Sequence, residues 1–207
     1  MILERFIVFE GLDGAGTTTQ ARLLADSLTA DGSRIDLDCE PTGGPIGTLI
    51  RSVLRGEQSI NPCSLAYLFA ADRHEHVHAA GTGILSRLEQ GYTIISDRYV
   101  YSSLAYQGTS CSDTLVSELN QRFPHPARVF YLDVPVNMCL ERIAERGHTE
   151  IFEKEQFLNG VASRYKSVLN EAESKGVQVH RLDGTASTEK IAAEISSIVA
   201  DSPITPM

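Results

Sequence analysis

The chain has 207 residues, of which 42% are hydrophobic and 22% are charged, and its formal net charge is −9. These values fit one soluble domain, residues 1–207, that is long enough to bury a core. The acidic balance argues against a broad surface for nucleic acid, while leaving room for a local basic pocket that binds a small anion.

The four cysteines are scattered along the chain without a C-x-x-C pair. The sequence shows neither a signal peptide nor an apolar run of about 18 residues. We therefore expect no membrane span and no dense disulfide framework, and we expect a reduced, cytoplasmic location.

Apolar runs typical of strands alternate with amphipathic stretches typical of helices. The predicted strands span residues 6–9, 33–38, 92–96, 128–132 and 177–182. The predicted helices span residues 17–29, 46–54, 62–76, 82–90, 101–107, 113–122, 136–146, 153–174 and 187–200. This alternation predicts an α/β fold in three layers, a five-stranded parallel sheet flanked by helices on both faces. Ligands of such sheets bind at the carboxyl ends of the strands.

The first predicted strand leads into a glycine-rich segment, Gly11-Leu12-Asp13-Gly14-Ala15-Gly16-Thr17-Thr18. Glycines let successive backbone N–H groups point inward, and the following helix adds the positive end of its dipole, so the segment can cradle phosphates. Gly11, Gly16 and Thr18 match the pattern G-x-x-x-x-G-K-[ST], which predicts an ATP-binding loop and a P-loop NTP hydrolase-like fold. Thr17 stands where that pattern has the lysine that reaches the β- and γ-phosphates. On this stretch alone, a purely structural turn is the alternative.

Two predicted strands end at an aspartate, Asp97 and Asp133. A carboxylate at such an edge can orient Mg²⁺, with Thr18 of the loop as a second ligand, and an adjacent guanidinium can clamp a phosphate. Because Arg98 follows Asp97 directly, we prefer Asp97 for the metal role. An ordinary surface ion pair at a strand end is the alternative.

Phe69 and Arg73 lie one turn apart on one face of the predicted helix 62–76. An aromatic ring and a guanidinium so placed can stack on a base and hydrogen-bond its edge, although a core phenylalanine with a solvated arginine is the commoner arrangement. Residues 74–78 read His-Glu-His-Val-His and match the H-E-x-x-H pattern of zinc proteases. Because no third ligand is evident, we interpret this run as a solvated helix face.

Four stretches, residues 9–20, 40–44, 68–73 and 97–108, together resemble the signature segments of the thymidylate kinase family in order and spacing. The most specific part is Asp97-Arg98-Tyr99 followed by Ser102-Ser103 and Ala105-Tyr106-Gln107-Gly108. The resemblance covers most of the chain. It implies transfer of the γ-phosphoryl group of ATP to dTMP with Mg²⁺, in a homodimer, and such chemistry depends on positioning and charge neutralisation.

The resemblance also implies roles for single residues. Phe69 would stack on thymine, Arg73 would hydrogen-bond its edge, and Tyr106 would crowd the sugar where a ribonucleotide carries its 2′-hydroxyl. Arg98 would hold the acceptor phosphate, and Asp13 would lie near the phosphates and the metal. The whole implied dTMP-binding set is Glu40, Arg51, Phe69, Arg73, Arg98, Ser103, Tyr106 and Gln107.

The sequence departs from the family pattern twice. Thr17 replaces the loop lysine, and Ile151 stands where a lid arginine is expected, in a mobile lid predicted at about residues 146–153. The nearest cations that could compensate are Arg142 and Arg146, which join Arg98 and Asp13 as the expected catalytic set. Losing one such cation without compensation costs roughly 3 kcal/mol, or about a hundredfold in rate.

Three explanations of Thr17 stay open: compensation by another cation, a weakened enzyme, or a substitution introduced by engineering. The main rival to a kinase is a catalytically weakened or inactive homologue that binds dTMP or another nucleotide. A kinase of a different deoxynucleotide is the second rival, against which Phe69, Arg73 and Tyr106 argue.

Overall fold

The computed structural model describes residues 1–145 and 155–201, and its elements follow the predicted order. The strands are β1 (Ile2–Gly11), β2 (Ile35–Cys39), β3 (Thr93–Asp97), β4 (His125–Asp133) and β5 (Gln178–Asp183). The helices are α1 (Thr17–Ala30), α2 (Pro45–Leu54), α3 (Pro62–His78), α4 (Ile84–Glu89), α5 (Val100–Ser110), α6 (Asp113–Asn120), α7 (Val136–Glu145), α8 (Glu155–Ser174) and α9 (Thr188–Asp201).

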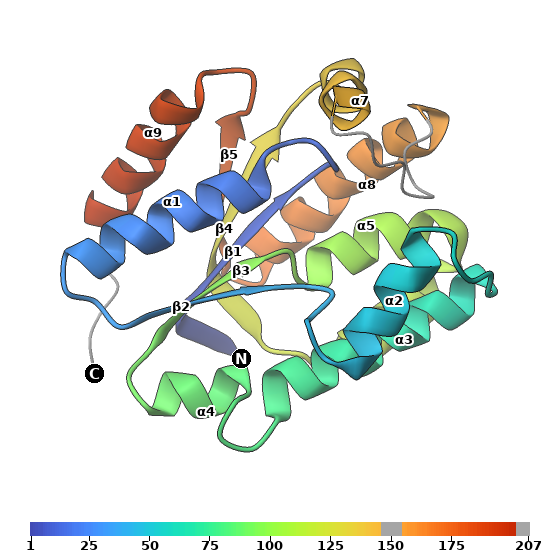
Figure 1. Cartoon of the computed structure of the whole chain (residues 1–207), viewed down its shortest axis with the longest axis horizontal. Helices are drawn as coiled ribbons and strands as arrows, with labels where there is room; N and C mark the ends of the chain where they lie inside the picture. Colours follow the sequence, from blue (N-terminus) through green and yellow to red (C-terminus); the bar gives the residue numbers. More distant parts are fainter. Residues whose placement is uncertain (146–154, 202–207) are drawn as a thin grey trace.

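The five strands form one sheet in the order β2-β3-β1-β4-β5, and every neighbouring pair is parallel. Figure 1 shows α1 and α9 on one face of this sheet, with α5 and α8 on the other. The predicted three-layer α/β fold is therefore confirmed. The central strand shows why a continuous apolar run predicted a strand here. Phe6–Phe9 are fully buried, as expected when both faces of a parallel sheet are covered.

Strand β4 begins earlier than predicted, at His125 rather than at 128. Ile2 pairs with His125 and Leu3 with Pro126, which carries the first strand back to the start of the chain. A proline is a poor sequence signal for a strand because it cannot donate a ladder hydrogen bond. The predicted helix 136–146 is described only as far as Glu145, and its expected end lies outside the described residues.

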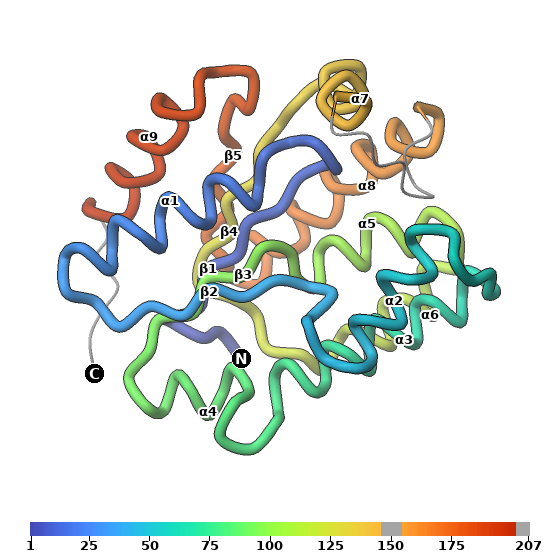
Figure 2. The backbone as a smooth tube through the Cα atoms, viewed as in Figure 1, coloured from blue at the N-terminus to red at the C-terminus, as the bar shows by residue number. Residues whose placement is uncertain are grey.

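Helices α2 and α3 pack side by side at the end of the sheet where β2 and β3 finish (Figure 2). Ile50, Val53, Leu54 and Leu65 form a small apolar cluster of their own between them. Phe69 packs against the margin of this cluster. A second, local core thus fixes the two helices that carry part of the predicted dTMP site.

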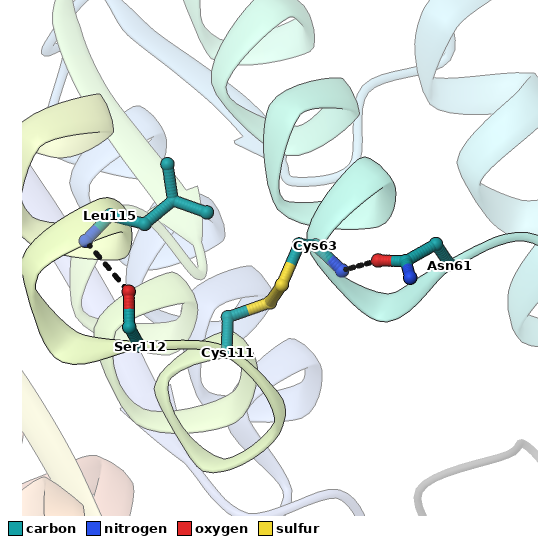
Figure 3. The surroundings of a disulfide bond; sticks show 5 residues. All are labelled: Asn61, Cys63, Cys111, Ser112 and Leu115. Atoms are coloured by element: carbon teal, nitrogen blue, oxygen red, sulfur yellow. Dashed lines mark hydrogen bonds between the residues drawn. A yellow bond between two sulfur atoms is a disulfide. The ribbon is translucent and has the colours of Figure 1, made fainter.

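A disulfide joins Cys63, in the first turn of α3, to Cys111, directly after α5 (Figure 3). Their Cα atoms lie 5.5 Å apart, within the normal range for a disulfide. Cys39 and Cys139 are free. The sequence did not predict this pair because a separation of 48 residues carries no local signal. Among the described residues, no helix is long and apolar enough to cross a membrane.

Candidate active site

The glycine-rich loop forms a tight turn between β1 and α1. Gly14 and Gly16 have φ values of 84° and 99°, a backbone conformation that favours glycine. A Cβ atom on Gly14 would lie 2.6 Å from the carbonyl oxygen of Cys139, so that position also lacks room for a side chain. Since α1 begins at Thr17, the loop presents backbone N–H groups and the positive end of a helix to one point.

A cavity of about 470 Å³ opens over this loop, at the carboxyl ends of β1, β2 and β3. Most of the predicted site lines it: Asp13, Gly14, Gly16, Thr17, Thr18, Glu40, Arg51, Phe69, Arg73, Asp97, Arg98, Ser103, Tyr106 and Gln107. Residues from five separate segments of the chain therefore meet in one hollow. Their individual roles stay predictions.

The remaining predicted residues lie elsewhere. Gly11, Leu12 and Ala15 belong to the loop but do not line the cavity. Arg142 does not line the cavity, but its guanidinium lies 3.4 Å from the carbonyl oxygens of Gly14 and Ala15 in the loop. Arg146 and the predicted lid lie outside the described residues.

Asp97 and Thr18 meet at the mouth of the loop. The Thr18 hydroxyl donates to Oδ2 of Asp97, while Oδ1 of Asp97 is buried and has no hydrogen-bond partner within the described chain. An unpartnered carboxylate oxygen beside a hydroxyl fits a hard cation such as Mg²⁺, which takes one or two protein oxygens and completes its shell with phosphate and water. Asp133, the competing candidate, is exposed and does not line the cavity. No cluster of three His, Cys, Asp or Glu side chains in the described ranges has the geometry of a metal site.

Arg98 is fixed at the centre of the cavity. Its φ of 75° is positive, which is rare for a residue with a side chain. The guanidinium donates to the carbonyl oxygen of Gly11 at 3.0 Å and to the Ser102 hydroxyl at 3.1 Å, and it pairs with Asp13. It also lies 5.3 Å from the centre of the Tyr106 ring. These contacts hold a cation beside the phosphate loop with little freedom to move.

Glu10 lies beneath Arg98 and is fully buried. Its carboxylate accepts hydrogen bonds from the backbone N–H groups of Tyr99 and Ser102, and from the hydroxyls of Ser102 and Tyr165. Burial raises the pKa of Glu10 to about 7, although the hydrogen bonds from Ser102 and the charge of Arg98 oppose that rise. Sequence analysis missed this residue because it reads as part of an ordinary buried strand.

Glu10 should make stability depend on pH. A folded-state pKa of about 7, against an ordinary value of 4.5, means that the folded chain binds this proton more tightly than the unfolded chain does. Its contribution is therefore fully present below pH 4.5 and is lost as the pH rises through 7, by up to about 3 kcal/mol. Urea unfolding at pH 5, 6, 7 and 8 measures this.

Glu10→Gln removes the ionisation, so the variant should gain free energy of unfolding relative to the wild type as the pH rises. Glu118→Gln, an exposed site on α6, is the control and should track the wild type. Parallel curves for the wild type and Glu10→Gln would show that the buried carboxylate does not titrate in this range.

Arg73 occupies the far end of the cavity and is only 1% exposed. The alternative interpretation of this helix face, in which Arg73 is a solvated arginine, is therefore wrong. Its guanidinium lies 2.7 Å from a Glu40 oxygen, donates to the Ser103 hydroxyl at 2.9 Å, and donates to the side chain of Asn120. Gln107 lies in the same wall, and its side-chain oxygen is buried without a partner in the described residues. This end of the cavity can hold a flat polar ring.

The prediction of a solvated helix face at residues 74–78 is wrong for two residues, Val77, which packs in the core, and His76. His74 and His78 are exposed and their rings lie 4.8 Å apart, but His76 is buried between Asp38 and Glu40. The physical reason is helix geometry: His76 follows Arg73 by three residues and so shares its inward face.

Sequence analysis also missed two positioning contacts. Asp72 accepts from the N–H of Thr42 at 2.7 Å and from its hydroxyl at 2.6 Å, and so anchors the loop at residues 40–44. Asn120, on α6, holds Arg73. The local sequence gives one signal that this face of α3 is buried and polar: the charged pair Asp72 and Arg73 directly follows an apolar run.

A glycine-rich loop between the first strand and first helix of a five-stranded parallel sheet, with a polar cavity above it, is typical of P-loop α/β nucleotide-binding proteins. The model of one family, described as thymidylate kinase, matches residues 9–195. The chain is 46% identical over 168 residues to a protein of Treponema pallidum (strain Nichols) that is provisionally named a thymidylate kinase, covering 81% of this chain and 80% of the relative. It is 41% identical over 170 residues to a probable thymidylate kinase of Methanococcus aeolicus, covering 82% and 81%.

The chain belongs to the thymidylate kinase family. Membership makes it an ATP-dependent nucleoside monophosphate kinase, a transferase of nucleotide biosynthesis. The matched range contains every predicted site residue, from the phosphate loop to the predicted lid. The comparisons give no positive support to the rival reading of an inactive nucleotide-binding homologue.

Proposed function

We propose that this chain transfers the γ-phosphoryl group of ATP to the 5′-phosphate of dTMP, giving dTDP for dTTP biosynthesis. One observation carries the proposal: a single cavity joins the phosphate loop to a polar pocket lined by Phe69, Arg73 and Gln107. Arg98 lies between the two ends, where the transferred phosphoryl group would pass. Donor and acceptor nucleotides would thus meet end to end in one hollow.

The chemistry needs alignment and charge neutralisation more than a covalent step. Backbone N–H groups of the loop would hold the ATP phosphates, while Arg98 would hold the acceptor phosphate in line. Asp13 orients Arg98 through their ion pair. Thr18 and Asp97 would hold Mg²⁺, which when bound neutralises phosphate charge. Arg51 also lines the cavity, where its guanidinium is held by the carbonyl oxygens of Pro41 and Thr42.

An ADP-release assay tests the proposal. With ATP and Mg²⁺ present, we expect turnover with dTMP that exceeds turnover with dCMP and dGMP, because Phe69 and Arg73 match a thymine face and edge. Turnover with dUMP, whose base has the same edge and lacks only the 5-methyl group, measures the contribution of that methyl group. If the chain and its Thr17→Lys variant both bind dTMP in calorimetry but neither releases ADP, the binding-only alternative replaces the kinase. The homodimer stays an expectation from the family resemblance, and light scattering measures it. The cytoplasmic location stays an expectation from the sequence.

Tyr106 should set the preference for deoxyribose. Its hydroxyl accepts the backbone N–H of Asp13 at 2.9 Å, so the ring is held across the cavity wall beside the loop. Tyr106→Ala removes the ring and should lower the ratio of kcat/KM for dTMP over its ribonucleotide counterpart by roughly tenfold. Tyr106→Phe keeps the ring, loses only the hydroxyl, and should keep that ratio. An unchanged ratio in Tyr106→Ala would remove Tyr106 from this role.

A further inference from the structure

A buried ion network lies behind the polar end of the cavity. We call it the His76 network; its members are Asp38, Glu40, Arg73, His76 and Arg87. Asp38 lies on β2, Glu40 follows that strand, Arg73 and His76 lie on α3, and Arg87 lies on α4. Three of these residues, Asp38, His76 and Arg87, belong to no part of the predicted site.

Glu40 is held from two sides by this network. Its Oε2 atom accepts from Nε of Arg73 at 2.9 Å and lies 2.7 Å from Nη2 of the same guanidinium. Its Oε1 atom lies 2.9 Å from Nδ1 of His76. The side chains of Glu40 and His76 are only 3% and 6% exposed, so water does not compete for these bonds. The position of Glu40, and through it that of Arg73, depends on His76.

His76 has a carboxylate on each ring nitrogen. Nε2 lies 2.8 Å from Oδ2 of Asp38, opposite the Glu40 contact. A neutral imidazole donates through one nitrogen only, whereas the imidazolium donates through both, so this geometry requires the charged form. Burial lowers the pKa of His76, but the bonds to Asp38 and Glu40 outweigh it and raise the pKa to about 9.

The charges of the network balance once Asp36, a partly exposed partner of Arg87 at its margin, is counted with it. Arg87 pairs with Asp38 and with Asp36, so three cations, Arg73, His76 and Arg87, face three carboxylates. Removing one member of such a buried set leaves an uncompensated charge, and the remaining partners shift to reduce it. His76 is the central link, because it alone joins the Asp38 pair to the Glu40 pair.

We propose that His76 is a positioning residue of the acceptor site, which holds Glu40 and thereby fixes Arg73 for contact with the edge of the base. This inference rests on the proposed function of Arg73. It also accounts for the middle histidine of the run at 74–78, whose outer two are exposed and touch each other. His76 contacts neither the loop nor the phosphate end, so its effect should fall on the acceptor nucleotide.

The first test compares His76→Gln with His78→Gln, the same substitution at an exposed position two residues further along α3. In His76→Gln, KM and Kd for dTMP should rise about tenfold or more, while KM for ATP and kcat at saturating dTMP change little. His78→Gln should match the wild type in all four. A uniform fall of kcat with an unchanged KM for dTMP would overturn the inference and indicate a general structural role.

A double-mutant cycle tests whether His76 affects dTMP binding through Arg73. If His76 acts through Arg73, His76→Gln should weaken dTMP binding much less in an Arg73→Gln background than in the wild type. Additive effects of the two substitutions on dTMP binding would overturn the proposed route. Thermal unfolding of each variant shows whether it folds before its binding is compared.

The pH dependence of dTMP binding, measured on the wild type and on His76→Gln, tests the same inference. Around His76 stand Asp38, Glu40, Arg73 and Arg87, with the buried Tyr99 nearby, and the pKa of Tyr99 is raised well above its ordinary value. His76 is thus the member that loses its charge as the pH rises through about 9, and wild-type affinity for dTMP should fall there.

His76→Gln lacks this transition, and ionisation of thymine itself affects both proteins equally. Matching pH profiles would overturn the inference. If the wild type phosphorylates dTMP and His76→Gln is indistinguishable from it, only this inference fails. If the wild type binds dTMP without releasing ADP, the proposed kinase function fails. The comparison of dTMP binding between the wild type and His76→Gln then still decides the role of His76. A wild type that does neither refutes both.

Discussion

Replacing Thr17 with lysine is expected to raise kcat for dTMP phosphorylation by about a hundredfold. Thr17 is the first residue of α1, is 5% exposed, and lines the cavity over the phosphate loop. Gly11, Gly16 and Thr18 fall in register with the loop pattern, so a lysine here extends toward the β- and γ-phosphates. A preorganised cation there stabilises charge that develops during transfer.

The arginines near the loop in the described part of the chain are each held by other partners, including Arg51, which the carbonyl oxygens of Pro41 and Thr42 hold. Arg98 is engaged with Asp13 and with the carbonyl oxygen of Gly11, and Arg73 is enclosed at the opposite end. Arg142 contacts the carbonyl oxygens of Gly14 and Ala15 in the loop. We therefore expect Thr17 to leave a real deficit of positive charge at the phosphates.

The measurement is kcat and KM for both substrates in the ADP-release assay. Thr17→Met adds length without charge and is the matched control, which should not gain activity. If Thr17→Lys leaves kcat unchanged while the wild type is already fast, a cation elsewhere compensates. Arg146, outside the described residues, then becomes the first candidate to replace.

Replacing Arg98 with glutamine should lower kcat/KM for dTMP by about a hundredfold to a thousandfold. The guanidinium is held by Asp13, Gly11 and Ser102 at the junction of the two nucleotide sites. A carboxamide keeps some of these hydrogen bonds but supplies no charge to the acceptor phosphate. Arg98→Lys keeps the charge, loses the two-pronged geometry, and should lie between the two.

Arg181→Gln is the control for this experiment, because Arg181, on β5, pairs with Glu173 of α8 in an exposed bridge and does not line the cavity. That variant should match the wild type in kcat/KM. Thermal unfolding separates loss of the fold from loss of function in Arg98→Gln, since Asp13 also loses its partner there. An Arg98→Gln protein that is folded and fully active would exclude Arg98 from the transfer step.

Most of the fold could be predicted from the sequence because its signals are local. Phe6–Phe9 and Val129–Leu132 are continuous apolar runs, as strands buried on both faces must be. Pro62 and Gly91 mark the start of one helix and the end of another. The observed start of β4 differs from the predicted one because Pro126, a residue type unsuited to a strand, is held in the sheet by its pairing with Leu3 of β1.

The candidate site was predicted less completely, and for a physical reason. The residues that touch substrate in the proposed arrangement lie in recognisable stretches, so most of them line the cavity as expected. Glu10, His76 and Asn120 act through partners that are distant in the chain, such as the contact between Asn120 and Arg73, 47 residues apart. The spacing of apolar residues along the sequence does not indicate which side chains of two helices form a hydrogen bond. The buried polar face of α3 also hides its amphipathic pattern, because Asp72, Arg73 and His76 all point inward.

The disulfide between Cys63 and Cys111 closes a covalent loop that contains most of the predicted acceptor site. Phe69, Arg73, Arg98, Ser103, Tyr106 and Gln107 all lie inside the closed loop of 48 residues, while the phosphate loop lies outside it. Closing a loop of this length removes conformational entropy from the unfolded chain, worth about 4 kcal/mol in the chain-entropy account. Most of the predicted acceptor site thus lies within a macrocycle, whereas Glu40, Arg51 and the phosphate loop lie outside it. Under reducing conditions this constraint on the unfolded chain is lost, so the protein should unfold at a lower denaturant concentration while its native contacts stay the same.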